Sequence, residues 1–153
     1  MLPTQSEGPG TFAQFDLSRV SSPSYVVDSE KIRSNLEILR DIGDRSGAKI
    51  LIALKAFSMW ALSGLIQEYL DGCCSSGLWE ARLAREKGFA ERDRSKILST
   101  FSPAYRSEEI DELAALSDHL IFNHPNSFGI DVAKNSGASV GLRINPELSL
   151  GLD

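Results

Sequence analysis

The chain has 153 residues, 42% of them hydrophobic, and a formal net charge of -5 at pH 7. This length and composition indicate one globular domain with a buried apolar core. Lys and Arg are dispersed among Asp and Glu instead of forming a basic block, so we expect no nucleic-acid partner. No apolar run approaches the ~20 residues that span a bilayer, and the N-terminus lacks a signal pattern, so we expect a cytoplasmic protein without membrane association.

The first ten residues are rich in Gly, Pro and Ser and show no periodicity. They predict a flexible tail at residues 1–10, with the folded domain at residues 11–153. A short strand is expected at residues 25–27. The helix after it has several candidate boundary residues, with Asp28 or Ser29 as its N-cap and Gly43 or Gly47 at its end.

Strands then alternate with helices along the rest of the chain. The expected strands are at residues 50–54, 71–75, 96–101, 119–123 and 139–145. The expected helices between them begin near residues 62, 76, 107 and 125, and Gly129 weakens the last of these. Such alternation predicts an α/β fold with a parallel sheet and right-handed crossovers.

Residues 50–54 form an apolar run, typical of a parallel strand that is covered on both faces, and a lysine follows at the next position. Because side chains alternate along a strand, Lys55 shares a face with Leu51 and Ala53. One interpretation is a lysine that ends the strand and extends into water. The other is an amine at the carboxyl end of a parallel strand, where α/β folds keep their active sites and where desolvation makes lysine a nucleophile toward carbonyls.

Four strings in the chain favour the second interpretation of Lys55. They are SPSYVVD at residues 22–28, ALKAFSMW at residues 53–60, SPAY at residues 102–105 and GLRINPE at residues 141–147. In this order they resemble motifs of the pyridoxal 5'-phosphate (PLP) decarboxylases with an alanine-racemase-like barrel. The segment around Lys55 is most similar to that of the carboxynorspermidine/carboxyspermidine decarboxylases, and the resemblance runs from about Phe12 to Glu147.

The resemblance implies a fold and an activity. The fold would be a partial PLP-binding (β/α)8 TIM-type barrel of alanine-racemase-like type, with about five of the eight βα units and without the C-terminal β-domain. The activity would be PLP-dependent decarboxylation of carboxynorspermidine or carboxyspermidine in polyamine biosynthesis, with Lys55 as the catalytic residue that holds PLP. Phosphate-binding turns, the partner of the ring nitrogen and the groups that recognise the substrate acid would lie outside this chain, and a full-length form would be a homodimer.

Arg143 is the second candidate for contact with the cofactor. Alternation along residues 139–145 assigns one face to Val140, Leu142 and Ile144, which would pack on helices, and the other to Gly141, Arg143 and Asn145. A buried charge needs a polar or anionic partner. Arg143 could pair with a structural carboxylate such as Asp71 or, as the resemblance implies, lie beside the PLP ring near its phenolic oxygen. Both could hold together.

Two groups of polar side chains follow other strands and are expected to be structural. Asp71, Ser75, Ser76 and Glu80 are expected around the end of the second strand, where Ser and Glu more often cap a helix than catalyse. Ser102, Pro103 and Tyr105 resemble the family's residues after the third strand, and they are expected to line a pocket without reacting.

Other residues that could catalyse or bind a metal also have simpler interpretations. His119 opens its strand and is expected at the edge of the sheet away from Lys55, whereas His124 is expected in a loop. Cys73 and Cys74 are expected to be small buried residues and not metal ligands, because no cluster of further ligands lies nearby in the sequence. Trp60 and Trp79 lie near strand ends, but core packing is the usual role of such residues.

Two alternatives to this activity remain open. Within the same class, the chain could be an ornithine, lysine or diaminopimelate decarboxylase. In another class, it could be an inactive barrel fragment that folds partly or only with a partner, because an open sheet leaves the strands at both edges unpaired.

Overall fold

The computed structural model describes residues 12–90 and 95–147, so the tail expected at residues 1–10 lies outside the described residues. The helices are α1 (Ser29–Ser46), α2 (Ser63–Tyr69), α3 (Leu78–Glu86), α4 (Ile110–Leu116) and α5 (Ile130–Asn135), with short 3-10 helices η2 (Leu17–Arg19) and η3 (Trp60–Leu62). The strands are β1 (Leu51–Ala53), β2 (Gly72–Ser75), β3 (Ile97–Phe101), β4 (His119–Phe122) and β5 (Ser139–Leu142). Within the described ranges, no helix has both the length and the apolar composition needed to cross a membrane.

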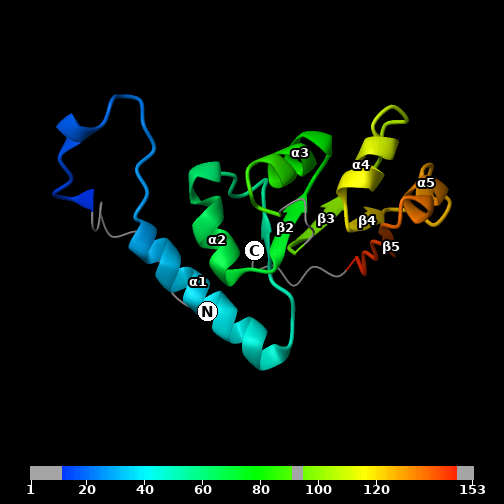
Figure 1. Cartoon of the computed structure of the whole chain (residues 1–153), viewed down its shortest axis with the longest axis horizontal. Coiled ribbons are helices and arrows are strands. Elements are labelled where there is room, and N and C mark those ends of the chain that lie inside the picture. Colours follow the sequence, from blue (N-terminus) through cyan, green and yellow to red (C-terminus); the bar gives the residue numbers. More distant parts are fainter. Residues whose placement is uncertain (1–11, 91–94, 148–153) are drawn as a thin grey trace.

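The five described strands form one parallel sheet in the order β1-β2-β3-β4-β5 (Figure 1). The register pairs Ala53 with Cys74, Cys74 with Ser99, and Ser99 with His119. Each strand therefore lies beside the strand that precedes it in the sequence, as successive βα units require. A doubly wound sheet would reverse its strand order, and the described strands show no reversal. The predicted α/β fold with a parallel sheet is confirmed.

Helices cover one face of this sheet. Figure 1 shows α3, α4 and α5 following one another along the sheet in the order of its strands. On the helix side, Cys73, Leu98 and Leu120 are fully buried. The alternate positions, such as Cys74 and Ser99, are only partly buried. The sheet therefore has one covered face and one partly open face in the described part of the chain.

The long helix α1 begins and ends at residues suited to those positions. The Asp28 carboxylate accepts hydrogen bonds from the backbone N–H groups of Glu30 and Lys31, which satisfies two free donors of the first turn. Gly47 follows the last turn with φ of 71°, a left-handed conformation that suits glycine. Of the boundary residues expected from the sequence, Asp28 and Gly47 are therefore the ones used.

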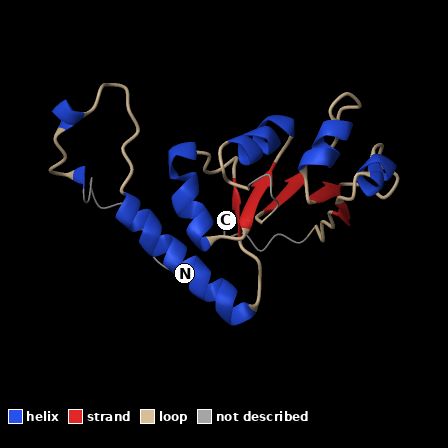
Figure 2. Cartoon of the chain, viewed as in Figure 1, coloured by secondary structure: helices blue, strands red, loops and turns tan. Residues whose placement is uncertain are grey.

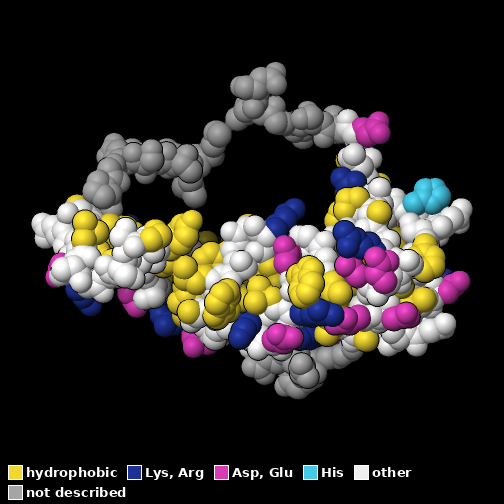
Figure 3. All heavy atoms as spheres, turned by 90° about the horizontal axis from the view of Figure 1, so that it is seen from above, with side chains coloured by type: hydrophobic (Ala, Val, Ile, Leu, Met, Phe, Trp, Pro, Cys, Tyr) yellow, Lys and Arg dark blue, Asp and Glu magenta, His cyan; other side chains and the backbone are white. Residues whose placement is uncertain are grey.

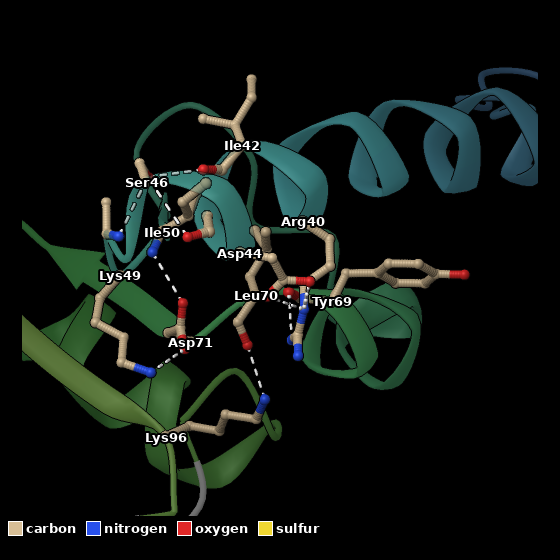
Figure 4. A network of polar contacts seen from close by, with 12 residues as sticks. Arg40, Ile42, Asp44, Ser46, Lys49, Ile50, Tyr69, Leu70, Asp71 and Lys96 are labelled. Carbon is tan, nitrogen blue, oxygen red and sulfur yellow. Dashed lines mark hydrogen bonds and ion pairs between the residues drawn. The ribbon is translucent and has the colours of Figure 1, made fainter.

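A polar network joins the amino ends of three strands (Figure 4). Asp71 accepts hydrogen bonds from Lys49 Nζ at 2.9 Å and from the Ile50 N–H at 3.0 Å. Lys96, just before β3, donates to the Leu70 carbonyl at 2.8 Å. Burial acts to raise the pKa of Asp71, but the Ile50 N–H and the Lys49 and Lys96 ammonium groups lower it, and the net direction is downward. Asp71 therefore holds the starts of β1 and β2 together as an ionised carboxylate.

One expected strand and two expected helix starts differ from the structure. Residues 25–27 form no strand and are drawn as loop in Figure 2, because no described strand lies beside them to complete a ladder, and Tyr25 is 95% exposed. The helix expected near residue 107 begins at Ile110. The helix expected near residue 125 begins at Ile130, because Gly129 has φ of 90° and cannot continue a right-handed helix.

Two predictions about coverage by helices are also corrected. The side chains of Leu142 and Ile144 are 49% and 82% exposed, because no described helix follows β5 to cover them, whereas Val140 does pack against the core. The strand before Lys55, expected to be covered on both faces, has half-buried residues throughout Leu51–Ala53. No described layer of the chain packs on the face of the sheet opposite the helices.

Candidate functional site

Lys55 lies in the turn that follows β1, at the carboxyl edge of the sheet. The Ala53 carbonyl accepts hydrogen bonds from the N–H groups of Ala56 and Phe57, so the chain turns away at once after the strand. Leu54 points into the core and is 1% exposed, whereas the Lys55 side chain is exposed. Lys55 therefore lies on the side of the sheet opposite the helices, as alternation predicts, but the described residues do not bury it.

A pocket of about 280 Å³ lies beside Lys55. Its walls come from the ends of β1, β2 and β3, and it is lined by Ala53, Lys55, Cys74, Ser75, Ser76, Phe101 and Pro103. Burial raises the pKa of the Cys74 thiol, so this thiol stays protonated at neutral pH and adds no negative charge to the pocket. Lys55 is the one cationic side chain in this lining.

Arg143 follows β5 at the same edge of the sheet. Its Cζ atom lies 5.5 Å from the centroid of the Phe101 ring, and its Nη1 donates to Asn123 Oδ1 at 3.3 Å. Phe101 also lines the pocket of Lys55, so one aromatic ring connects the two candidate residues. Of the two alternatives for Arg143, the pairing with Asp71 does not occur, because Asp71 precedes β2 and lies at the opposite edge of the sheet.

The polar residues around β2 divide between its two ends. Asp71 was expected near the end of β2, beside Lys55. It lies instead at the amino end of this strand. Ser75 is buried on the helix side, where its hydroxyl lies 2.6 Å from that of Thr100. The Glu80 carboxylate accepts hydrogen bonds from the backbone N–H and the hydroxyl of Ser76, at 2.7 and 3.0 Å. Ser76 and Glu80 are thus bonded to each other, a structural role as predicted, but they do not cap α3, because its N-cap is Gly77 and no side chain caps its first turn.

Tyr105 is part of the wall expected after β3. Its hydroxyl lies 2.7 Å from the Ile121 carbonyl and 3.3 Å from the Thr100 carbonyl, and it accepts a hydrogen bond from the Ser102 N–H. Burial raises the pKa of Tyr105 to about 12, while the Ser102 N–H acts in the opposite direction. The hydroxyl is therefore protonated at neutral pH and bridges the carboxyl ends of β3 and β4.

The histidines lie where the sequence predicts. His119 is the first residue of β4, at the amino edge of the sheet. His124 lies in the loop after β4, where its Nδ1 accepts a hydrogen bond from the Asn126 N–H. Among the described residues, no three His, Cys, Asp or Glu side chains come together in a way that could hold a metal ion.

Cysteine and tryptophan positions correct two expectations. Cys73 is fully buried as predicted, but Cys74 is half-buried in the wall of the Lys55 pocket. Trp60 and Trp79 are 60% and 74% exposed and do not pack in the core. The Trp79 ring instead faces the guanidinium of Arg82 at 4.8 Å. On the face that Figure 3 draws, hydrophobic side chains are interspersed with basic and acidic ones.

The sequence motifs point to neither Phe101 nor Asn123. Both lie at the carboxyl ends of strands, Phe101 as the last residue of β3 and Asn123 directly after β4. The signal that could have found them is position, because parallel strands bring their carboxyl ends to one edge of the sheet. Applying the alternation used for Lys55 to the other strand ends would have placed Phe101 on the same side.

The arrangement of Lys55 and Arg143 can be compared with known proteins. No family model matches the chain. A carboxynorspermidine/carboxyspermidine decarboxylase of Campylobacter jejuni is 41% identical over 132 residues, which are 86% of this chain and 33% of that protein. The resemblance to this family is therefore confirmed. The chain also matches the crystal structure of carboxynorspermidine decarboxylase from Campylobacter jejuni, complexed with norspermidine, with a TM-score of 0.75. The match covers 85% of this chain and 34% of the chain in that crystal structure.

Two further relatives extend the similarity to carboxynorspermidine/carboxyspermidine decarboxylases and to a related enzyme. The carboxynorspermidine/carboxyspermidine decarboxylase of Herminiimonas arsenicoxydans is 36% identical over 130 residues, which are 85% of this chain and 34% of that protein. A carboxyaminopropylagmatine decarboxylase of Synechocystis sp. is 31% identical over 135 residues, which are 87% of this chain and 33% of that protein. The chain thus spans about one third of the length of the curated relatives that it matches.

Proposed function

We propose that the chain forms part of a PLP-dependent decarboxylase of carboxynorspermidine or carboxyspermidine, acting in polyamine biosynthesis. The observation that carries this proposal is the position of Lys55, beside a pocket at the carboxyl edge of a parallel sheet, in a chain 41% identical to such an enzyme over 132 residues. The carboxyl edge is where parallel α/β folds hold their ligands. A lysine there is suited to attach a carbonyl cofactor.

The described residues fit a small ring-shaped cofactor. The pocket of about 280 Å³ is just below the ~300–1,000 Å³ range of ligand sites. Phe101 and Pro103 offer apolar walls, and the Lys55 amine is free of ion pairs and hydrogen bonds within the described residues. Lys49, by contrast, is tied to Asp71 at the other edge. We assign no described residue to the phosphate group.

Lys55, Arg143 and Cys74 would each have a different part in the reaction. PLP, when bound, supplies an electron sink for the charge that loss of CO₂ leaves on the substrate. Lys55 would hold the cofactor covalently through its amine. Arg143 would direct its positive charge toward the phenolic oxygen of the ring and so fix its orientation. Cys74 would act as a neutral wall, because its protonated thiol does not compete with the Lys55 amine.

The remaining parts of the proposal concern the whole protein. Five parallel strands in sequence order support a (β/α)8 barrel of alanine-racemase-like type, to which the chain would contribute five βα units. The substrate would be a carboxylated polyamine. The whole protein would be a homodimer and would be located in the cytoplasm. The norspermidine bound to the Campylobacter jejuni enzyme supports the substrate class.

A second candidate substrate is carboxyaminopropylagmatine. The 31% identity to the Synechocystis decarboxylase over 135 residues favours it as a related activity of the same pocket. The higher identity, 41%, to the Campylobacter jejuni enzyme favours carboxynorspermidine or carboxyspermidine. The reported relatives all act on such carboxylated amines by their names, which favours this class over ornithine, lysine or diaminopimelate.

Lys55 can be tested by covalent labelling. We expect that PLP at less than one equivalent, followed by borohydride reduction, attaches mainly to the peptide that contains Lys55. The physical reason is that the pocket walls hold the aldehyde beside this amine and beside no other described lysine. Peptide mapping by mass spectrometry measures the share of label on each lysine.

Two variants serve as controls for this labelling. Lys55→Ala should lose most of the label, whereas Lys87→Ala, at an exposed position after α3, should retain it. Label that is spread evenly over exposed lysines such as Lys31 and Lys87 would contradict the proposal.

A further inference from the structure

The Arg143 side chain is exposed but not free to sample all its conformations. The ring of Phe101 lies under the guanidinium, with Cζ 5.5 Å from the ring centroid. Asn123 accepts a hydrogen bond from Nη1 at 3.3 Å. These contacts restrain the guanidinium from two directions, one from below and one from the side. An arginine without these contacts would lose its side-chain conformational entropy at the moment a ligand binds, whereas Arg143 has already lost part of it.

The two contacts come from neighbouring strands. Phe101 ends β3, Asn123 follows β4, and Arg143 follows β5, so three adjacent strand ends meet at the guanidinium. The Arg143 backbone N–H also donates to the Phe122 carbonyl at 2.8 Å, which fixes the root of the side chain. Phe101 is at the same time a wall of the Lys55 pocket. The exposed guanidinium is thereby held against a ring that also lines the pocket.

Tyr105 braces the strand ends that carry these two contacts. Its hydroxyl lies 2.7 Å from the carbonyl of Ile121 in β4 and 3.3 Å from that of Thr100 in β3. Its ring packs edge-on against Phe122 with the centroids 5.2 Å apart. Because the ladder between β3 and β4 ends at Phe101, this hydroxyl bridges the two strands where backbone pairing stops.

We propose that Phe101 and Asn123, braced by Tyr105, are positioning residues that direct Arg143 toward a ligand bound at Lys55. The identity of that ligand as PLP rests on the proposed function. The positioning itself is a property of this chain and can be measured without a cofactor. Phe101 attracts the cation through its ring face and Asn123 through its amide oxygen, so the loss of either loosens the guanidinium.

The Nε–Hε signal of Arg143 in an NMR spectrum reports this contact directly. A proton over an aromatic face is shielded, so we expect the signal of the 15N-labelled chain to lie upfield of that of a free arginine. Arg143→Met assigns the signal by removing it. Phe101→Leu should move it downfield toward the free position, and Phe101→Tyr, which keeps the ring, should leave it in place.

Three further variants complete the experiment. Asn123→Ala, at an exposed position, and Tyr105→Phe, which keeps the ring but loses the hydroxyl, should each shift the signal partly toward the free position. Trp79→Leu is the matched control, because Trp79 faces Arg82 in the same kind of contact at 4.8 Å. It should shift the signal of Arg82 and leave that of Arg143 unchanged.

Titration with PLP connects the positioning to the ligand. Added PLP should shift the Arg143 signal further, and the concentration at half-shift should rise by about two- to fivefold in Phe101→Leu, the range expected for an exposed cation–π contact. An Arg143 signal that stays in place in Phe101→Leu, or an equal PLP response in both proteins, would overturn the proposal. If Phe101→Leu does not fold, an unchanged signal in Asn123→Ala overturns it instead.

Failure of the proposed function has a different signature. It would appear as PLP label scattered over many lysines, while the Arg143 signal still responds to the Phe101 and Asn123 variants. A concentrated label on Lys55 with an unresponsive Arg143 signal would instead reject the positioning role alone.

Discussion

Asp71 is a residue whose role depends on where its partners lie in the fold. Its carboxylate bonds the ammonium of Lys49 and the N–H of Ile50, and the charge of Lys96 also lowers its pKa against the opposing effect of burial. A lowered pKa means that the folded state favours the ionised form. The stability from Asp71 is therefore fully present above the unfolded pKa of about 3.8 and is lost as pH falls through the lower folded value.

Replacing Asp71 by Asn should lower the free energy of unfolding by about 1–3 kcal/mol at pH 7, because the charge that holds Lys49 is removed. Urea denaturation at pH 7 and at pH 3 measures the difference from the unmodified chain, which should shrink at the lower pH. Asp44→Asn is the control, since its pair with Arg40 is exposed and should contribute less than ~1 kcal/mol. An equal loss at both pH values for Asp71→Asn would contradict this account.

The faces of Lys55 and Arg143 could be predicted because alternation along a strand is a local property of the chain. Their neighbours could not be predicted in the same way. Contact between Arg143 and Phe101 depends on β4 lying between their strands, which is a matter of sheet order. The exposure of Trp60 was also missed, because an apolar side chain near a strand end can face either the core or the solvent.

At the scale of secondary-structure elements, β2 begins at a backbone position that only glycine fits. Gly72 has φ of 150°, and a Cβ atom there would lie 2.0 Å from the Ile97 carbonyl oxygen and 2.6 Å from the Ile97 nitrogen. Backbone atoms of β3 cannot move away without breaking the pairing of Gly72 with Ile97. Close approach of β2 and β3 therefore depends on the absence of a side chain.

Gly72→Ala should lower the free energy of unfolding by about 2 kcal/mol or more, because it adds both backbone strain and a clash. Gly64→Ala is its matched control in α2, where a Cβ atom meets nothing within 4 Å. That change should raise the free energy of unfolding by up to ~1 kcal/mol, because alanine favours the helix. Chemical denaturation of both variants is the measurement, and a shift of the same sign in both would refute the explanation.

Periodicity predicted most elements because each strand or helix has a buried face. It could not predict that residues 25–27 lack a partner strand, since a ladder requires a neighbour as well as suitable side chains. The start of α5 was placed too early for a similar reason. Gly129 approaches Ile110 so closely that a Cβ atom would lie 2.4 Å from its side chain, and this contact with α4 sets where α5 begins.

At the scale of the whole molecule, the described residues leave one face of the sheet only partly covered, and the chain spans about one third of the length of its curated relatives. The described residues supply a lysine, an arginine and the walls of a pocket. The resemblance implies that groups for the phosphate, the ring nitrogen and the substrate acid come from elsewhere. Rates of enzymes depend on all of these being held in place, since misplacement by ~1 Å can cost ~100-fold.

We therefore expect the 153-residue chain by itself not to release CO₂ from carboxynorspermidine or carboxyspermidine at an enzymatic rate. The measurement is CO₂ release by purified chain with added PLP, with Lys55→Ala as the control. Lysine-dependent turnover near the ~1–1,000 per second typical of enzymes would show that the described pocket suffices.

The unbroken strand order also has a consequence for how the chain is made. Paired positions such as Ala53 with Cys74 and Ser99 with His119 are only 20 to 25 residues apart throughout the sheet. Each strand can therefore dock on its predecessor as it leaves the ribosome, without waiting for a distant segment. Nascent chains arrested after β3, β4 and β5 should gain protease resistance in steps, so that synthesis and folding advance together from the first strand to the last.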